Sequence, residues 1–199
     1  AFSVPAAETA IRFVSPLFGS LTLPFVFLLG RKLYSPRIGF LATLFVAFLP
    51  LHINSSSVSF VESLSGLLAV IAVYLLFCKR ILLSAVFVGL SLVSKQNMFV
   101  MLPLFFGKLL FDYRSNLKSF ISKSVFSVTI IFLIGLPWFI RNYVLIGNPV
   151  WPFLYKVLGG RIVPHVPGLS PGVLLSFSHV TTFYLEMFGI PLGNLAALS

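Results

Sequence analysis

The chain of 199 residues is 58% hydrophobic and only 9% charged, whereas soluble domains average roughly 45–50% apolar and about 25% charged residues. This composition excludes a water-soluble globule, because too little polar surface is present to cover one. The net charge of +10 does not indicate a nucleic-acid binder, since the Lys and Arg residues stand singly between apolar runs and do not gather on one face. Lipid headgroups and phosphates are the expected anionic partners.

Six apolar runs qualify as possible membrane spans, each needing about 20 apolar residues or fewer at an interface. In chain order they cover residues 9–30, 38–53, 60–77, 81–94, 97–111 and 119–140. The fourth run reaches only about 21 Å at about 1.5 Å per residue, so we expect it to end below one surface or to pair with its successor around Lys95. The predicted fold class is an all-α integral membrane bundle of about six transmembrane helices.

The character of the chain changes after Arg141, where recurrent Pro and Gly residues exclude a long helix. We expect an outer loop on the membrane surface, in which a polar stripe predicts a short interfacial amphipathic helix over residues 173–188. The members of this stripe are Ser176, His179, Thr182 and Glu186. The predicted organisation is therefore a multi-span membrane domain at residues 1–141 followed by an extracytoplasmic loop at residues 142–199.

Orientation is predicted from the basic residues, because Lys and Arg in short loops are retained on the cytoplasmic side. If the six runs alternate, the larger group of the 14 Lys and Arg residues falls on one side, and we assign it to the cytoplasm. This group is Arg31, Lys32, Arg37, Lys79, Arg80, Lys108, Arg114, Lys118 and Lys123. The smaller group is Arg12, Lys95, Arg141, Lys156 and Arg161. The smaller group then lies on the outer face of the cell membrane, which is a plasma membrane or an inner membrane.

The charged residues at the outer ends of the spans are the candidate functional residues. The middles of the spans hold only neutral polar side chains, whereas coupled transporters place ionisable groups near the midplane. The outer ends instead carry Glu8, Arg12, Glu62, Lys95 and Arg141. Cations at the interface make charge-assisted hydrogen bonds to phosphate, and a carboxylate nearby suits a metal or a sugar hydroxyl.

Each of these residues also has a purely structural interpretation. Glu62 follows Ser59 in the spacing of a capping box, and Lys95 can extend its ammonium to the lipid headgroups. Arg141 suits an interfacial anchor, and Arg12 suits a salt bridge to Glu8. The sequence shows no His/Cys metal spacing, nucleophile elbow, phosphate-binding loop or dinucleotide fingerprint.

Three stretches resemble a known family. RFVSPLFGSLTLPFVFLLGRKLYSPRIGFLATLFVAFLPLHINSSS, GLSLVSKQNMFVMLP and GLPWFIRNYVLIGNPVWPFLYKVLGG are similar to ordered motifs of the polyprenyl-phosphate-dependent glycosyltransferases. This superfamily has the C-type membrane fold and includes protein mannosyltransferases and the aminoarabinose transferases of lipid A. The second stretch has Ser94 where the family pattern has Thr. The most specific of these motifs is the element in which Pro-Trp-x-x-Arg-Asn, ending in Arg141 and Asn142, is followed by the Gly-Asn-Pro motif at residues 147–149 and by VWPF.

The resemblance implies a hexosyl or pentosyl transfer from a polyprenyl- or dolichyl-phosphate donor to a protein or glycolipid acceptor on the outer face. It further implies a divalent metal, Mg or Mn, and a general base that is an Asp in the first outer loop. No residue here matches that Asp, which we expect upstream of residue 1, so we expect the chain to be a piece of a longer protein and to be inactive alone. Lys95, Arg141 and Arg12 are expected to bind the lipid phosphate, with Glu62 on the sugar or metal side.

Two other functions remain open from the residues alone. A transporter or flippase for a lipid-linked substrate predicts charges deep in the spans and inverted repeats. A noncatalytic membrane scaffold, or an inactive member of the family, predicts that no acidic outer loop precedes the first run.

Overall fold

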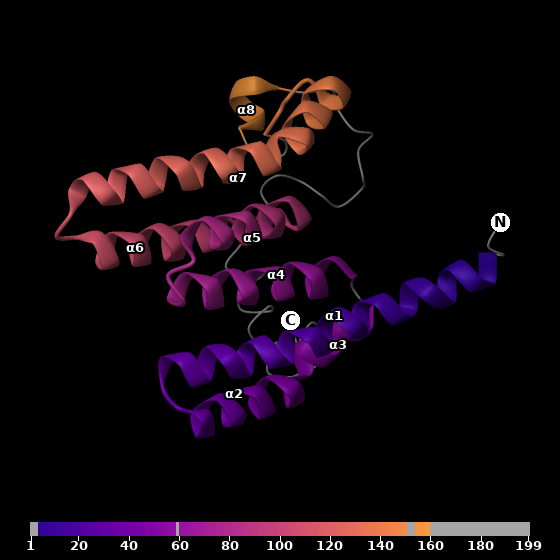
Figure 1. Cartoon of the computed structure of the whole chain (residues 1–199). Coiled ribbons are helices and arrows are strands. Elements are labelled where there is room, and N and C mark those ends of the chain that lie inside the picture. The colour runs from indigo at the N-terminus through magenta and orange to yellow at the C-terminus, as the bar shows by residue number, and fades with distance from the viewer. Residues whose placement is uncertain (1–3, 59, 151–153, 160–199) are drawn as a thin grey trace, which may run out of the picture. The chain divides into compact units, whose positions relative to one another are not determined.

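The computed structural model describes residues 4–58, 60–150 and 154–159, and every regular element within these ranges is a helix (Figure 1). The elements are α1 (Val4–Leu33), α2 (Pro36–Phe48), α3 (Pro50–Val58), α4 (Phe60–Phe77), α5 (Ile81–Ser94), the 3₁₀ helix η1 (Gln96–Val100), α6 (Met101–Tyr113), α7 (Leu117–Ile146) and α8 (Tyr155–Leu158). The chain divides into a first unit, Ala1–Phe48 with His52–Trp138, and a second unit, Leu49–Leu51 with Phe139–Ser199. The interfacial helix predicted at 173–188 lies outside the described residues.

The predicted all-α class is confirmed for the described residues, since all six apolar runs fall on helical segments. Two helical segments are long and apolar enough to cross a membrane on their own, Phe13–Leu33 of α1 and Leu117–Ile146 of α7. The bent pair α2 and α3 brings the number to three if it forms one span. The helices α4 and α5 are apolar but shorter. The structure therefore supports two or three spans by length and does not confirm six.

The predicted run 38–53 is not one helix. The axis bends by 60° between Pro36–Phe48 and Pro50–Ser57. Pro50 explains the break, because its ring disfavours helical geometry in the preceding residue and its nitrogen carries no hydrogen to donate. The hydrophobic composition continues on both sides of Pro50, which is why the run looked continuous in the sequence.

The helices of the first unit have defined directions, which follow from their contacts. Ser15 contacts Ser63 and the Phe25 ring contacts the Tyr74 ring, so α1 and α4 run parallel. Ser84 and Ser91 of α5 donate hydrogen bonds to carbonyls of α4 that lie progressively earlier in the sequence, so α4 and α5 are antiparallel. Lys108 of α6 lies over a ring at the end of α4. The turns that follow α1, α4 and α6 therefore lie at one common end of this unit.

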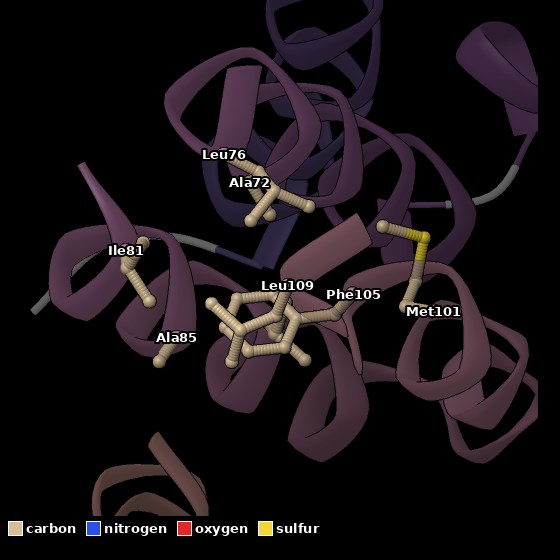
Figure 2. Close-up of a cluster of buried hydrophobic side chains, with 8 residues drawn as sticks. Ala72, Leu76, Ile81, Ala85, Met101, Phe105 and Leu109 are labelled. Atoms are coloured by element: carbon tan, nitrogen blue, oxygen red, sulfur yellow. The ribbon is translucent and has the colours of Figure 1, made fainter. Parts of the chain in front are cut away.

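A hydrophobic cluster joins α4, α5 and α6 (Figure 2). Its buried members are Ala72, Leu76, Ile81, Ala85, Val88, Met101, Phe105 and Leu109. Partly buried side chains of α7, among them Ile130 and Ile131, pack against it. Small residues help α5 to approach its neighbours: Ala85 is fully buried, and a Cβ placed on Gly89 would lie 3.1 Å from the side chain of Ile134 in α7.

The helices α1 and α2 approach each other most closely at a pair of glycines. A Cβ built on Gly39 would lie 2.7 Å from the carbonyl oxygen of Phe27 and 2.8 Å from the backbone nitrogen of Arg31. A Cβ on Gly30 would lie 2.6 Å from the Cα of Gly39. Backbone atoms cannot move aside cheaply, so the α1–α2 hairpin requires glycine at this contact. Close backbone approach through small residues is the usual way helices associate where lipid provides no hydrophobic drive.

Candidate functional site

Lys95 occupies a break between two helices. The α-helix α5 ends at Ser94, and Lys95 has extended backbone angles, φ −149° and ψ 122°. Its N–H still donates to the carbonyl of Ser91, 3.0 Å away, and its own carbonyl accepts the N–H of Met98 to start η1. The turn predicted around Lys95 is therefore confirmed. Because hydrogen bonds on both sides fix this backbone, the origin of the Lys95 side chain is fixed as well.

Glu62 lies opposite Lys95 in the first turn of α4. The Lys95 Nζ donates to the Glu62 Oε1 at 2.8 Å, across 33 residues of sequence. A carboxylate is favoured at this position, because the unpaired N–H groups at a helix N-terminus carry partial positive charge. The side chain of Lys95 is 30% exposed and that of Glu62 is 42% exposed, so both charges remain open to a ligand.

Buried serines connect the helices beneath this ion pair. The Ser91 hydroxyl of α5 donates to the Ser65 carbonyl of α4 at 3.1 Å, and the Ser65 hydroxyl in turn donates to the Glu62 carbonyl at 3.0 Å. Further along the same interface, the Ser84 hydroxyl donates to the Ala72 carbonyl at 2.7 Å. These bonds fix the register between α4 and α5, so they also fix the distance between the two charged side chains.

A second group of serines joins α1, α3 and α4 at the same end of the unit. The hydroxyls of Ser15 and Ser63 lie 3.0 Å apart, and Ser63 donates to the carbonyl of Ser55 at 2.9 Å. Sequence reasoning missed both groups of serines. The sequence shows that serines recur on these largely apolar helices, but this recurrence does not identify the hydrogen-bond partner of each serine.

The opposite end of the first unit carries the basic residues. All nine Lys and Arg residues assigned to the cytoplasmic group lie in the turns after α1, α4 and α6 or within about two helical turns of them. Lys108 forms an ion pair with Asp112 and lies 5.1 Å from the centre of the Phe77 ring. Lys123 lies 5.2 Å from the centre of the Tyr113 ring. Within the first unit, the basic group and the Glu62–Lys95 pair thus lie at opposite ends.

Arg141 belongs to the second unit and is an exposed residue of α7. It precedes the buried Asn142 and lies one turn or more before the end of the helix. That end is formed by Gly147, which has a positive φ of 84° and donates its N–H to the carbonyl of Tyr143 at 2.9 Å. A left-handed glycine is the usual helix terminator. The Gly of the Gly-Asn-Pro motif therefore has a structural role.

The Asn of the same motif organises the following turn. Asn148 is fully buried, its amide nitrogen donates to the carbonyl of Gly159 at 3.1 Å, and its amide oxygen accepts the N–H of Val150 at 3.0 Å. The Asn148 side chain thus links the end of α7 to the backbone of Val150 and of Gly159.

Several predicted residues fall outside what the structure describes. Arg12 lies on α1, but its side chain is not among those described, and the same holds for Glu8. The capping box is untested because Ser59 is not described. The structure brings Glu62 and Lys95 together, and Arg141 is described only within its own unit.

The described residues do not fit a divalent metal site. In the part of the chain that the structure describes, no three His, Cys, Asp or Glu side chains gather around a common point. Glu62 is a single carboxylate beside an ammonium group, and that positive charge disfavours a second cation at the same place. No chemical step is assigned to a metal held by these residues.

These features define an integral membrane protein whose charged candidate site lies where helices end. The family model for dolichyl-phosphate-mannose-protein mannosyltransferase matches residues 4–140. The chain belongs to this family, and the predicted resemblance to protein mannosyltransferases is thereby confirmed. The match includes the first two motif stretches and ends at Ile140, before most of the third. The family indicates a membrane glycosyltransferase. No curated protein and no solved structure matches the chain.

Proposed function

We propose that the protein transfers a sugar from a polyprenyl-phosphate donor to a protein or glycolipid acceptor on the extracytoplasmic face of the cell membrane. The observation that carries this proposal is the Glu62–Lys95 pair, which is open to a ligand in a chain of the mannosyltransferase family. The pair lies at the end of the first unit opposite the nine basic residues. Since basic loops remain in the cytoplasm, the pair faces outward.

Lys95 binds the phosphate of the donor in this proposal, together with Arg141 and Arg12. An ammonium or guanidinium group makes short, charge-assisted hydrogen bonds to phosphate oxygens. When the bond from the sugar to the phosphate breaks, negative charge grows on the leaving phosphate, and fixed cations stabilise this charge best in the transition state. Glu62 accepts hydrogen bonds from the sugar hydroxyls on the other side of the donor.

The general base is proposed to come from an Asp in an outer loop that precedes residue 1 in the longer protein. The base removes the proton from the acceptor, a contribution of typically 10²–10⁴-fold. The divalent metal implied by the family resemblance is assigned to acids of the same loop, because the described residues supply no set of metal ligands. This chain then contributes the binding of the donor.

All six apolar runs are proposed to serve as spans in the longer bundle. The helix α5 reaches only about 21 Å at about 1.5 Å per residue, short of a bilayer core of about 30 Å. Local thinning of the bilayer accommodates such a helix at modest cost. The short α5 supports a Lys95 that lies below the outer surface, at the depth of a lipid phosphate.

Replacing Lys95 or Arg141 by Ala in the full-length protein tests this function. We expect transfer from a dolichyl-phosphate-linked sugar to fall by about 10²-fold or more, the usual cost of removing one group that stabilises developing charge. Lys108→Ala is the matched control, because it removes a lysine from the other ion pair found among the described residues of the first unit, and it should leave the rate unchanged. Unchanged transfer kinetics in both Lys95→Ala and Arg141→Ala would refute the proposed phosphate site.

A further inference from the structure

The Glu62–Lys95 pair raises a question that the proposed function leaves open. Lys95 is assigned to the lipid phosphate, yet in the structure its ammonium already contacts a carboxylate at 2.8 Å. A carboxylate and a phosphate are both oxyanions that accept hydrogen bonds from the same donors. The Glu62 carboxylate therefore occupies part of the coordination shell that an incoming phosphate requires.

The pair contributes little that the fold needs. Its members are 30% and 42% exposed, and partly exposed ion pairs between long side chains typically stabilise a protein by at most about 1 kcal/mol. The interface between α4 and α5 is held independently by the hydrogen bonds of Ser84 and Ser91 and by the buried cluster. The Lys95 backbone is fixed by its own hydrogen bonds. The pair can open without disturbing the helices that carry it.

The charge on the lipid phosphate changes during the transfer. The donor is a phosphodiester and carries one negative charge. The bond between the anomeric carbon and the phosphate oxygen breaks, its electron pair stays on that oxygen, and the acceptor oxygen bonds to the anomeric carbon while its proton passes to the base. The product is a phosphomonoester, which carries about −1.5 to −2 charges at pH 7. A lysine that only attracts phosphate would hold this product more tightly than the donor.

We propose that Glu62 is a positioning residue that competes with the lipid phosphate for Lys95 and thereby promotes release of the lipid product. This inference rests on the proposed function. Binding of the donor displaces the carboxylate from the ammonium and leaves it available to the sugar hydroxyls. After transfer, the sugar leaves with the acceptor, the carboxylate returns to Lys95, and its negative charge repels the product phosphate.

The experiment measures binding of dolichyl monophosphate to the full-length protein in nanodiscs, with dolichol as the uncharged control lipid. Glu62→Gln should bind dolichyl monophosphate more tightly than wild type, by up to about fivefold, because a competing ion pair of this exposure has been removed. Asp112→Asn is the matched control, since it opens the Lys108–Asp112 ion pair of α6, and its affinity should be unchanged. Lys95→Ala should bind at least about tenfold more weakly.

Steady-state kinetics give a second readout that a structural role would not move. In Glu62→Gln, inhibition by added dolichyl monophosphate should occur at correspondingly lower concentrations, and kcat should fall more than kcat/KM because product release slows. Glu62→Ala serves as a second variant, and thermal unfolding confirms that each variant is folded.

The outcomes separate this inference from the proposed function. If Lys95→Ala weakens binding while Glu62→Gln and Glu62→Ala bind no more tightly than wild type, competition by Glu62 is overturned and the phosphate site stands. If Lys95→Ala binds dolichyl monophosphate as wild type does, the phosphate site itself is overturned. Tighter binding by the Glu62 variants, with Asp112→Asn unchanged, supports the competition.

Discussion

Two ion pairs in the described part of the first unit use the same two functional groups in different ways. Lys108 and Asp112 are four residues apart on α6, and their side chains are 22% and 20% exposed. Lys95 and Glu62 are 33 residues apart, join two helix ends, and are 30% and 42% exposed. The first pair stabilises one helix face among aromatic rings. The second requires α4 and α5 to be correctly packed before it can form, and it is the more open of the two.

The difference shows how a structural ion pair can be distinguished from a candidate ligand site in a membrane protein with few charged residues. The local Lys108–Asp112 pair neutralises its own two charges within one helix at the basic end. A pair formed across helices leaves two opposite charges at the end of short helices, where a polar ligand can exchange with one of them. The Glu62–Lys95 pair differs from the Lys108–Asp112 pair in its longer sequence separation and its greater exposure, more than in residue type.

The largest expected effect concerns the sides of the membrane that the two ends face. In a Cys78→Ser background, a cysteine at Asn97 should react fully with a membrane-impermeant maleimide added outside intact cells, because Asn97 is exposed two residues beyond Lys95. A cysteine at Ser115, exposed in the turn between α6 and α7, should react only after the cells are opened. Equal labelling of both positions from outside would break the assignment of opposite ends to opposite faces.

A smaller effect is expected at the glycines that close the α1–α2 hairpin near the basic end. Gly39→Ala should reduce the free energy of unfolding by about 1–3 kcal/mol, the usual cost of overpacking, because its Cβ would meet backbone atoms at 2.7 and 2.8 Å. Equilibrium unfolding in mixed micelles measures the change. Gly107→Ala on α6 is the matched control, since nothing lies within 4 Å of its Cβ, and it should be neutral or slightly stabilising.

The smallest effect is expected in the serine contacts that set the register beneath the site. Ser84→Ala should lower the unfolding free energy by roughly 0.6 kcal/mol, the average for hydrogen bonds between membrane helices, because it removes the bond to the Ala72 carbonyl. Ser127→Ala should have no such cost, since its buried hydroxyl has no hydrogen-bond partner among the described residues. A larger loss in Ser127→Ala than in Ser84→Ala would contradict the role given to these contacts.

Much of the fold was predictable because apolar runs and helix breaks are local properties. The run 81–94 ended where its length and Lys95 suggested, and the α4 run matched its helix. Two runs differed: the run 38–53 breaks at Pro50, where proline lies inside a continuously apolar segment, and the run 97–111 begins in the 3₁₀ helix η1 before α6. The number of membrane spans was harder to predict, because helices such as α4 and α5 are apolar enough to cross a membrane but are short.

The candidate site was predictable only in part. Glu62 and Lys95 were both placed at outer helix ends, because alternation of the runs requires it. Their direct contact was not predictable, since it depends on the register between α4 and α5, which buried serines determine. Conversely, the Lys108–Asp112 pair follows from a local signal, because residues four apart on a helix lie next to each other. Arg141 and Arg12 remain predictions, because the structure does not describe them together with Lys95.

Exchanging the two charges of the open pair tests the central claim most directly. The double variant Glu62→Lys with Lys95→Glu can rebuild the ion pair in reverse, so we expect its thermal unfolding to remain close to that of wild type. It removes the cation from the position assigned to the lipid phosphate, so transfer from a dolichyl-phosphate-linked sugar should fall by about 10²-fold or more. A folded double variant that retains wild-type transfer would show that the pair is structural and would contradict the phosphate site.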